Sequence, residues 1–304
     1  MNNSSKNKFY NIAIVVLLLI LGILCISIFI SKQSNDSDSI NNIESENTSE
    51  ESISPPDTSI DEDKTKEDES KEEDRFKDLP LISDDRGVPV LYYHSIDPSE
   101  SNEVILSPQK LKAQLQYIKD SGYTTLTMTE LNDYISKHTP IPEKSIVITF
   151  DDGYKDNYTN AFPILKELDM KATIFVITSV IDDGYYLSKN EIKELSDYGI
   201  DIQSHTVKHL HLNTLSYEEQ LKELKSSKET LEAITNKPVI SVAYPFGDHD
   251  ENTLKAAKAS GYNLGFLTDK GLAKPTSQSI SLNRIYVSSA YSMDTFKERL
   301  LNTK

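Results

Sequence analysis

The sequence predicts an α/β domain built on a parallel sheet, and two observations lead to this prediction. From Val88 onward, short apolar runs alternate with segments of helical periodicity. The connections between these segments are short, and such alternation is typical of parallel sheets with right-handed crossovers. Seven or eight strands of this kind could close into a barrel or remain an open doubly wound sheet. Periodicity alone does not separate the two.

The expected strands are short apolar runs rich in β-branched and aromatic residues. In chain order they are 90–93, 123–126, 146–150, 172–177, 200–204, 239–243, 264–267 and 282–287.

The helices are expected between these runs. Leu111, Leu115 and Ile118 recur at spacings of four and three, which marks one helix face that ends before Gly122. A capping box at 216–219 opens a long helix, and a glycine at position 199 suits the end of the helix before it. The remaining helices are expected near 158–168, 191–198, 251–260 and 293–301.

The N-terminal part of the chain predicts a membrane anchor. Residues 12–30 are almost unbroken apolar and carry no charge, and about 20 such residues span a bilayer. Lys6 and Lys8 favour a cytoplasmic N-terminus, so we expect a cytoplasmic tail (1–8), a signal anchor (9–31) and an extracellular domain on a single-pass membrane protein. A cleaved signal peptide is the alternative. Cys25 is the only cysteine, so the outer domain forms no internal disulfide.

Residues 32–80 are expected to be a disordered acidic linker before a catalytic domain at 81–304. The chain has a formal net charge of −16, and 17 acidic but only five basic residues fall within 33–80. Such a segment buries too little apolar surface to offset its ordering entropy. No basic stripe or arm is present, so nucleic acid is not an expected partner. The oligomeric state is left open.

Two polar clusters follow expected strands and suggest metal chemistry. Asp151 and Asp152 come directly after 146–150, and His205 and His209 come directly after 200–204. One carboxylate and two imidazoles make a three-ligand set for a divalent ion, and the two His could share a face if the segment turns helically. The spare carboxylate could act as a base towards water. Taken singly, a solvated Asp-Asp-Gly turn and an incidental His pair explain the same residues.

These motifs resemble those of a known family. Thr149-Phe-Asp-Asp-Gly-Tyr and His205-Thr-x-x-His are similar to the first two motifs of the polysaccharide deacetylases (carbohydrate esterase family 4, the NodB-homology domain). Pro89–Ile96 and Ala243–Gly247 resemble the branch that contains bacterial poly-N-acetylglucosamine deacetylases. The resemblance covers roughly 87–304 and implies a distorted (β/α) barrel of about seven parallel strands.

The resemblance also implies roles for single residues. Asp152, His205 and His209 would be the metal ligands, Asp151 the general base and His94 the general acid. The alternative for His94 is a structural His that caps its strand. The family's third motif normally carries an Arg that orients the base; Ala243 stands there in this chain, and Arg284 is the candidate substitute, with a surface Arg as the alternative. Phe246 would contribute a backbone N–H to the oxyanion site. Phe246 and Tyr244 could also pack on a sugar ring, although aromatics near a barrel mouth can simply be core.

The expected function is a metal-dependent N-deacetylase. It would release acetate from N-acetylglucosamine units of a cell-surface glycan with one divalent ion, zinc being expected and cobalt, nickel or manganese the alternatives. An anchored domain reaches the inner wall, which favours peptidoglycan; the branch resemblance favours secreted poly-N-acetylglucosamine. A glycan-binding wall protein without turnover is the alternative of another class, supported by the missing Arg of the third motif.

Overall fold

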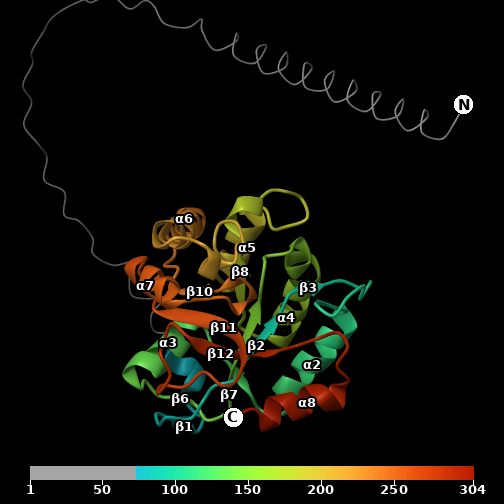
Figure 1. Ribbon diagram of the computed structural model, residues 1–304. Helices are drawn as coiled ribbons and strands as arrows, with labels where there is room; N and C mark the ends of the chain where they lie inside the picture. The colour runs from blue at the N-terminus through green and yellow to red at the C-terminus, as the bar shows by residue number, and fades with distance from the viewer. Residues whose placement is uncertain (1–72) are drawn as a thin grey trace, which may run out of the picture. The chain divides into compact units, whose positions relative to one another are not determined.

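The computed structural model describes residues 73–304, and these form a closed parallel barrel with helices outside it (Figure 1). The strand order is β2-β12-β11-β10-β9-β8-β7, and β7 also pairs with β2, which closes the ring. Every pair in the ring is parallel. The predicted barrel of about seven strands is therefore confirmed. The barrel strands are β2 (Val90–Tyr93), β7 (Ser145–Phe150), β8 (Thr173–Val176), β9 (Asp201–Ser204), β10 (Ser241–Ala243), β11 (Leu264–Lys270) and β12 (Leu282–Tyr286).

Seven α-helices of the described region follow or precede these strands. They are α2 (Pro108–Asp120), α3 (Met128–Lys137), α4 (Phe162–Leu168), α5 (Lys189–Tyr198), α6 (Tyr217–Thr235), α7 (Glu251–Ala259) and α8 (Met293–Asn302). The predicted capping box opens α6, where Ser216 accepts from the N–H of Glu219. Gly199 ends α5 with a φ of 107°. Helix α3 was not expected, although Thr127 and Glu130 form a capping box at its start.

Smaller elements complete the domain. Strand β5 (Thr124–Thr125) pairs with the first residues of β7, whereas β8 pairs with the last residues of β7. Two short pairs lie outside the barrel, β1 (Leu81–Ile82) with β6 (Ile141–Pro142) and β3 (Ser95–Ile96) with β4 (Ile105–Leu106). The short helical turns are η1 (Glu73–Phe76), η2 (Asn157–Ala161), η3 (Thr178–Val180), η4 (Leu212–Thr214) and η5 (Pro245–Gly247).

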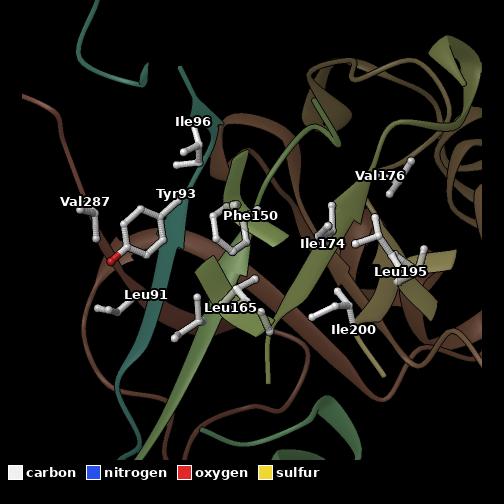
Figure 2. Close-up of a cluster of buried hydrophobic side chains, with 14 of the residues drawn as sticks. Leu91, Tyr93, Ile96, Phe150, Leu165, Ile174, Val176, Leu195, Ile200 and Val287 are labelled. Carbon is white, nitrogen blue, oxygen red and sulfur yellow. The ribbon is translucent and has the colours of Figure 1, made fainter. Parts of the chain in front are cut away.

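Side chains of each strand alternate between two cores. Leu91, Tyr93, Phe150 and Val176 belong to the outer cluster, together with helix residues such as Leu165 and Leu195 (Figure 2). The inward positions form a second cluster, which includes Val90, Val147, Phe175, Phe266 and Leu282. This period of two is what a barrel imposes on its strands. It also decides which polar residues of a strand can reach the interior.

The segment before the barrel contacts the domain. Arg75, near the end of the expected linker, donates to the carbonyl of Thr125 at 2.5 Å and to Glu130 at 3.0 Å. The expected anchor at 9–31 and most of the linker lie outside the described residues. Within 73–304, no helix combines the length and apolarity that a membrane span requires.

Candidate active site

The two adjacent carboxylates stand on a tight turn at the carboxyl end of β7. Successive side chains of an extended strand point to opposite faces, so a turn is needed to bring both to one place. Asp152 and Gly153 supply it with φ values of 73° and 77°. The turn is held by backbone hydrogen bonds from Ile177 to the carbonyl of Asp152 and from Leu187 to the carbonyl of Gly153. Both carboxyl groups are almost completely buried at the barrel mouth.

Asp152 meets the two expected imidazoles. Its Oδ1 lies 3.3 Å from Nε2 of His205 and 3.4 Å from Nε2 of His209, and one ligand atom from each of the three lies within 4.8 Å of the others. Nδ1 of His205 lies 2.7 Å from the carbonyl oxygen of Ala243. That contact places a proton on Nδ1, so Nε2 is the ring nitrogen that a metal ion would use in place of the proton it shares with Asp152.

The pKa values of Asp152 and His209 suit a cation. Burial lowers the pKa of His209 to about 4, so this imidazole is neutral at pH 7 and its lone pair is available. Burial by itself raises the pKa of Asp152, but the hydrogen bond and charge of His205 outweigh burial and hold that pKa well below its usual range. Asp152 is therefore an anion. The donor set of one carboxylate and two imidazoles fits a divalent metal ion.

The segment that carries the imidazoles is not helical, which corrects the expected reason for their convergence. Thr206 and His209 have φ values of 67° and 55°, and these left-handed residues fold the chain back on itself. The hydroxyl of Thr206 accepts from the N–H of His209 at 3.1 Å. Glu223 of α6 accepts from the N–H groups of Val207 and Lys208 at 3.1 and 2.8 Å. A buried carboxylate thus anchors this loop from outside it, and no local pattern had pointed to Glu223.

Asp151 faces Arg284 inside the barrel. Nη1 and Nη2 of Arg284 donate to the two carboxylate oxygens, each at 2.8 Å. Arg284 is 0% exposed; its Nε donates to the carbonyl of Leu267, and its guanidinium lies 4.3 Å from the ring centre of Tyr92. Burial raises the pKa of Asp151, but the charge of Arg284 and these hydrogen bonds outweigh burial and hold the pKa below its usual value. The alternative of a surface Arg is wrong.

His94 follows β2 and reaches the same mouth. Burial lowers the pKa of its imidazole, whose ring lies beside those of Tyr92 and Tyr286, with centroids 5.9 and 6.3 Å away. Its Nδ1 is buried and makes no hydrogen bond with the part of the chain that the structure describes. The backbone of His94 is held by Asn157, whose Nδ2 donates to the His94 carbonyl at 2.8 Å.

Two residues just beyond the Asp-Asp motif therefore position the His94 loop. Asp156 accepts from the hydroxyl of Ser95 at 2.5 Å and from the N–H of Ile96 at 2.9 Å. Asn157 opens η2, a π-helical turn, and such turns are frequent at functional sites. Sequence reasoning missed both residues, because their partners lie about 60 positions earlier.

Phe246 lies at the mouth after β10. It is 51% exposed and stacks on His211 with ring centroids 4.0 Å apart, and it forms a T-shaped pair with His209 whose ring centroids are 4.6 Å apart. His211 itself pairs with Asp248 and is not part of the three-residue cluster. Phe246 stands in the first turn of η5, where backbone N–H groups have no intrahelical acceptor. Its N–H can therefore serve an external oxygen.

Tyr244 does not reach this surface, which corrects the expected sugar contact. Its side chain is 0% exposed. Its hydroxyl donates to the carbonyl of Ile280 at 3.0 Å. A buried Tyr that has found an internal acceptor is a core residue.

Unusual backbone conformations gather around the mouth. Asp152, Thr206, His209 and Phe246 all have positive φ, and this region is costly for β-branched and bulky residues. Such residues persist where the surroundings hold them, and they cluster at active sites. The mouth of the barrel is therefore the candidate active site, because it gathers three side chains that could hold a cation, an ionised buried carboxylate, an imidazole and the backbone N–H of Phe246.

Comparisons with known proteins agree on one family. A family model described as polysaccharide deacetylase matches residues 138–265. YxkH of Bacillus subtilis (strain 168), a protein named for that family, is 38% identical over 209 residues, which cover 69% of this chain and 74% of YxkH. A poly-beta-1,6-N-acetyl-D-glucosamine N-deacetylase of Staphylococcus epidermidis is 30% identical over 198 residues, covering 60% of this chain and 68% of that protein.

A solved structure is similar as well. The Streptococcus pyogenes deacetylase PplD, in complex with acetate, aligns with a TM-score of 0.67 and 35% identity over 71% of this chain and 99% of PplD.

Proposed function

Since the chain belongs to the polysaccharide deacetylase family of amide hydrolases, we propose that it removes acetyl groups from N-acetylglucosamine units of a cell-surface glycan. The reaction uses one divalent metal ion, for which zinc is the first candidate. The observation that supports this most is the meeting of Asp152, His205 and His209 beside the buried pair of Asp151 and Arg284. Binding alone would not need a second, ionised carboxylate next to the first.

The residues divide the reaction between them. A divalent ion held by Asp152, His205 and His209 would lower the pKa of a bound water towards about 7 and polarise the acetyl carbonyl. Asp151, kept ionised by Arg284, takes the proton of the attacking water. The N–H of Phe246 stabilises the developing oxyanion. His94, in its protonated form, gives a proton to the amine nitrogen as the C–N bond breaks, which yields acetate and a glucosamine unit; because burial lowers its pKa, this step favours the lower part of the working pH range.

Two glycans are candidates. Peptidoglycan follows from the expected membrane anchor, which would keep the domain close to the inner wall. Poly-β-1,6-N-acetylglucosamine is favoured by a different observation, the 30% identity to the Staphylococcus epidermidis deacetylase of that polymer. Acetate release by the purified protein, measured on both polymers, separates them.

The test of the reaction itself uses acetate and metal content together. We expect about one divalent ion per chain, loss of that ion in a variant that combines His205→Ala and His209→Ala, and loss of acetate release with it. Full metal retention in that variant would place the ion elsewhere. A metal-loaded wild-type protein that binds glycan but releases no acetate would support the non-catalytic wall protein instead.

We also propose that residues 9–31 anchor the chain in the cell membrane with the catalytic domain outside. The apolar run 12–30 and the lysines before it support this proposal. Digestion of intact cells by an added protease should remove the domain. Full protection, or recovery of the protein in a salt-washed supernatant, would contradict it.

A further inference from the structure

An exposed tyrosine stands beside the candidate active site in the connection from β8 to α5. Tyr185 is 61% exposed, more than any other aromatic residue in the part of the chain that the structure describes. Phe246, also at the mouth, is 51% exposed. Exposed aromatic rings at a rim offer flat apolar faces to a ligand, and the hydroxyl of Tyr adds a polar edge.

The segment that carries Tyr185 is fixed to the Asp-Asp turn. The carbonyl of Tyr185 accepts from the N–H of Lys155 at 3.0 Å, and the carbonyl of Gly153 accepts from the N–H of Leu187 at 2.9 Å. Tyr154 and Tyr186 form an antiparallel bridge between these two bonds. The loop is therefore a short ribbon on the residues that follow Asp152, and its position is set by the same turn.

Three tyrosine rings pack on this ribbon. The rings of Tyr154 and Tyr186 stack at 5.2 Å with an interplanar angle of 18°. The ring of Tyr185 stands nearly perpendicular to both, 5.5 Å from each and at angles of 81° and 85°. The rings of Tyr154 and Tyr186 restrict the rotamers of Tyr185, so the Tyr185 side chain loses little conformational freedom when a ligand binds. Preorganisation of this kind lowers the cost of binding.

The strand order places Tyr185 and Phe246 on opposite sides of the imidazoles. Phe246 follows β10, His205 and His209 follow β9, and Tyr185 follows β8, and these three strands are neighbours. The ribbon of Tyr185 is bonded to the residues that follow β7, so the two aromatic residues are rooted two to three strands apart, and adjacent strands are about 4.8 Å apart. One sugar ring at the reacting position cannot cover both, whereas two consecutive units of a chain can.

We propose that Tyr185 is a subsite for the sugar unit next to the one that is deacetylated, and that it binds the apolar C–H face of that pyranose ring. The ligand is a chain of linked hexosamine units, and the enzyme selects units that have a neighbour on this side over single sugars. This inference rests on the proposed deacetylase function for the position of the reacting unit. The binding of a neighbouring ring to Tyr185 can be measured without turnover.

The experiment compares Tyr185→Ala with Tyr185→Phe, and uses Tyr198→Ala as the matched control. Tyr198 is 44% exposed and ends α5, directly before β9 begins, which places it at the opposite end of the barrel. Substrates are N-acetylglucosamine itself, its β-1,4-linked and β-1,6-linked tetramers, and a small aryl acetate ester. Binding of both tetramers is measured in the Asp151→Asn background, which is expected to stop turnover.

We expect Tyr185→Ala to raise KM for at least one tetramer, and its Kd in the Asp151→Asn background, by about 3–10-fold, the range of one aromatic contact. Rates on the single sugar and on the ester should stay at the wild-type level. Tyr185→Phe and Tyr198→Ala should behave as wild type.

Wild-type tetramer affinity in Tyr185→Ala, or an equal loss in Tyr198→Ala, would overturn the subsite. A tetramer that binds in a Tyr185-dependent way but is never deacetylated would keep the subsite and refute the proposed function. Loss of ester hydrolysis in Tyr185→Ala would show instead that the Asp-Asp turn has been disturbed, and would also count against a role limited to the neighbouring sugar.

Discussion

Replacing Arg284 by Met tests the buried ion pair that holds the proposed base. Arg284 and Asp151 have side chains that are 0% and 3% exposed, and two hydrogen bonds of 2.8 Å join them. Removing one partner of such a pair costs about 3–5 kcal/mol, because the other charge is left buried and unpaired. Folded domains are stable by about 5–15 kcal/mol. We therefore expect Arg284→Met to remain folded with a clearly lower midpoint in urea.

The same change should alter how acetate release depends on pH. Without the guanidinium, burial is left to raise the pKa of Asp151. A protonated carboxyl cannot take a proton from water, so the rate at pH 7 should fall by about 10²–10⁴-fold. The rate should recover part of the loss as the pH is raised and Asp151 ionises. Arg284→Lys keeps a charge but not the two-pronged contact, and we expect an intermediate effect.

A double-mutant cycle separates the pair from the rest of the barrel. Asp151→Asn, Arg284→Met and the combined variant are unfolded in urea, and the free energies of unfolding are compared. Because the combined variant leaves no unpaired charge, its loss should be smaller than the sum of the single losses by at least about 2 kcal/mol. Additive losses, or a pH profile of Arg284→Met that matches the wild type, would refute the reasoning.

Three further predictions concern single residues. His94→Asn should cut amide hydrolysis by about 10²–10⁴-fold but cut hydrolysis of an activated aryl acetate far less, since that leaving group needs little protonation; equal losses would mean that His94 is not the proton donor. Glu223→Ala removes the acceptor for two backbone N–H groups of the loop that carries His205 and His209, and it should weaken metal affinity by about 10–100-fold. Glu223→Gln keeps an acceptor and should lose less metal affinity. An unchanged metal affinity in Glu223→Ala would contradict the anchoring role. Burial raises the pKa of Asp201 from 3.8 to about 6, and this carboxyl accepts from the N–H of Met128 at 2.7 Å. The folded state therefore holds the proton more tightly than the unfolded chain, so the free energy of unfolding should decline by about 1–3 kcal/mol between pH 4 and pH 6 relative to Asp201→Asn. Parallel stability curves for the two proteins would show that the Asp201 pKa is not raised.

Much of the architecture could be predicted from local pattern. The apolar runs predicted the strands because a barrel buries both faces of each strand, and their positions agree with the structure to within one to three residues at most ends. The capping box at Ser216 and the glycine after α5 marked helix ends correctly. Polar motifs directly after strand runs had to meet at one end of a parallel barrel, which is why the carboxylates and imidazoles were predictable as a group.

The contacts that make the site work were decided by the tertiary structure. Arg284 and Asp151 are 133 positions apart in the sequence. They meet inside the barrel because β12 pairs with β2 and β2 pairs with β7, which brings both side chains to the same height in the interior. The loop after β9 looked helical by spacing, yet Glu223 and two left-handed residues give it another shape.

The same division explains the aromatic residues. The sequence by itself placed Tyr244 and Phe246 near the mouth, but it could not separate Tyr244, which is buried, from Phe246, which is exposed, and it gave no sign that Tyr185 lies there as well. Composition and periodicity describe which residue types a strand or helix needs. Which of them faces a partner, a ligand or solvent depends on the register and closure of strands far apart in the chain, and only the folded barrel fixes that.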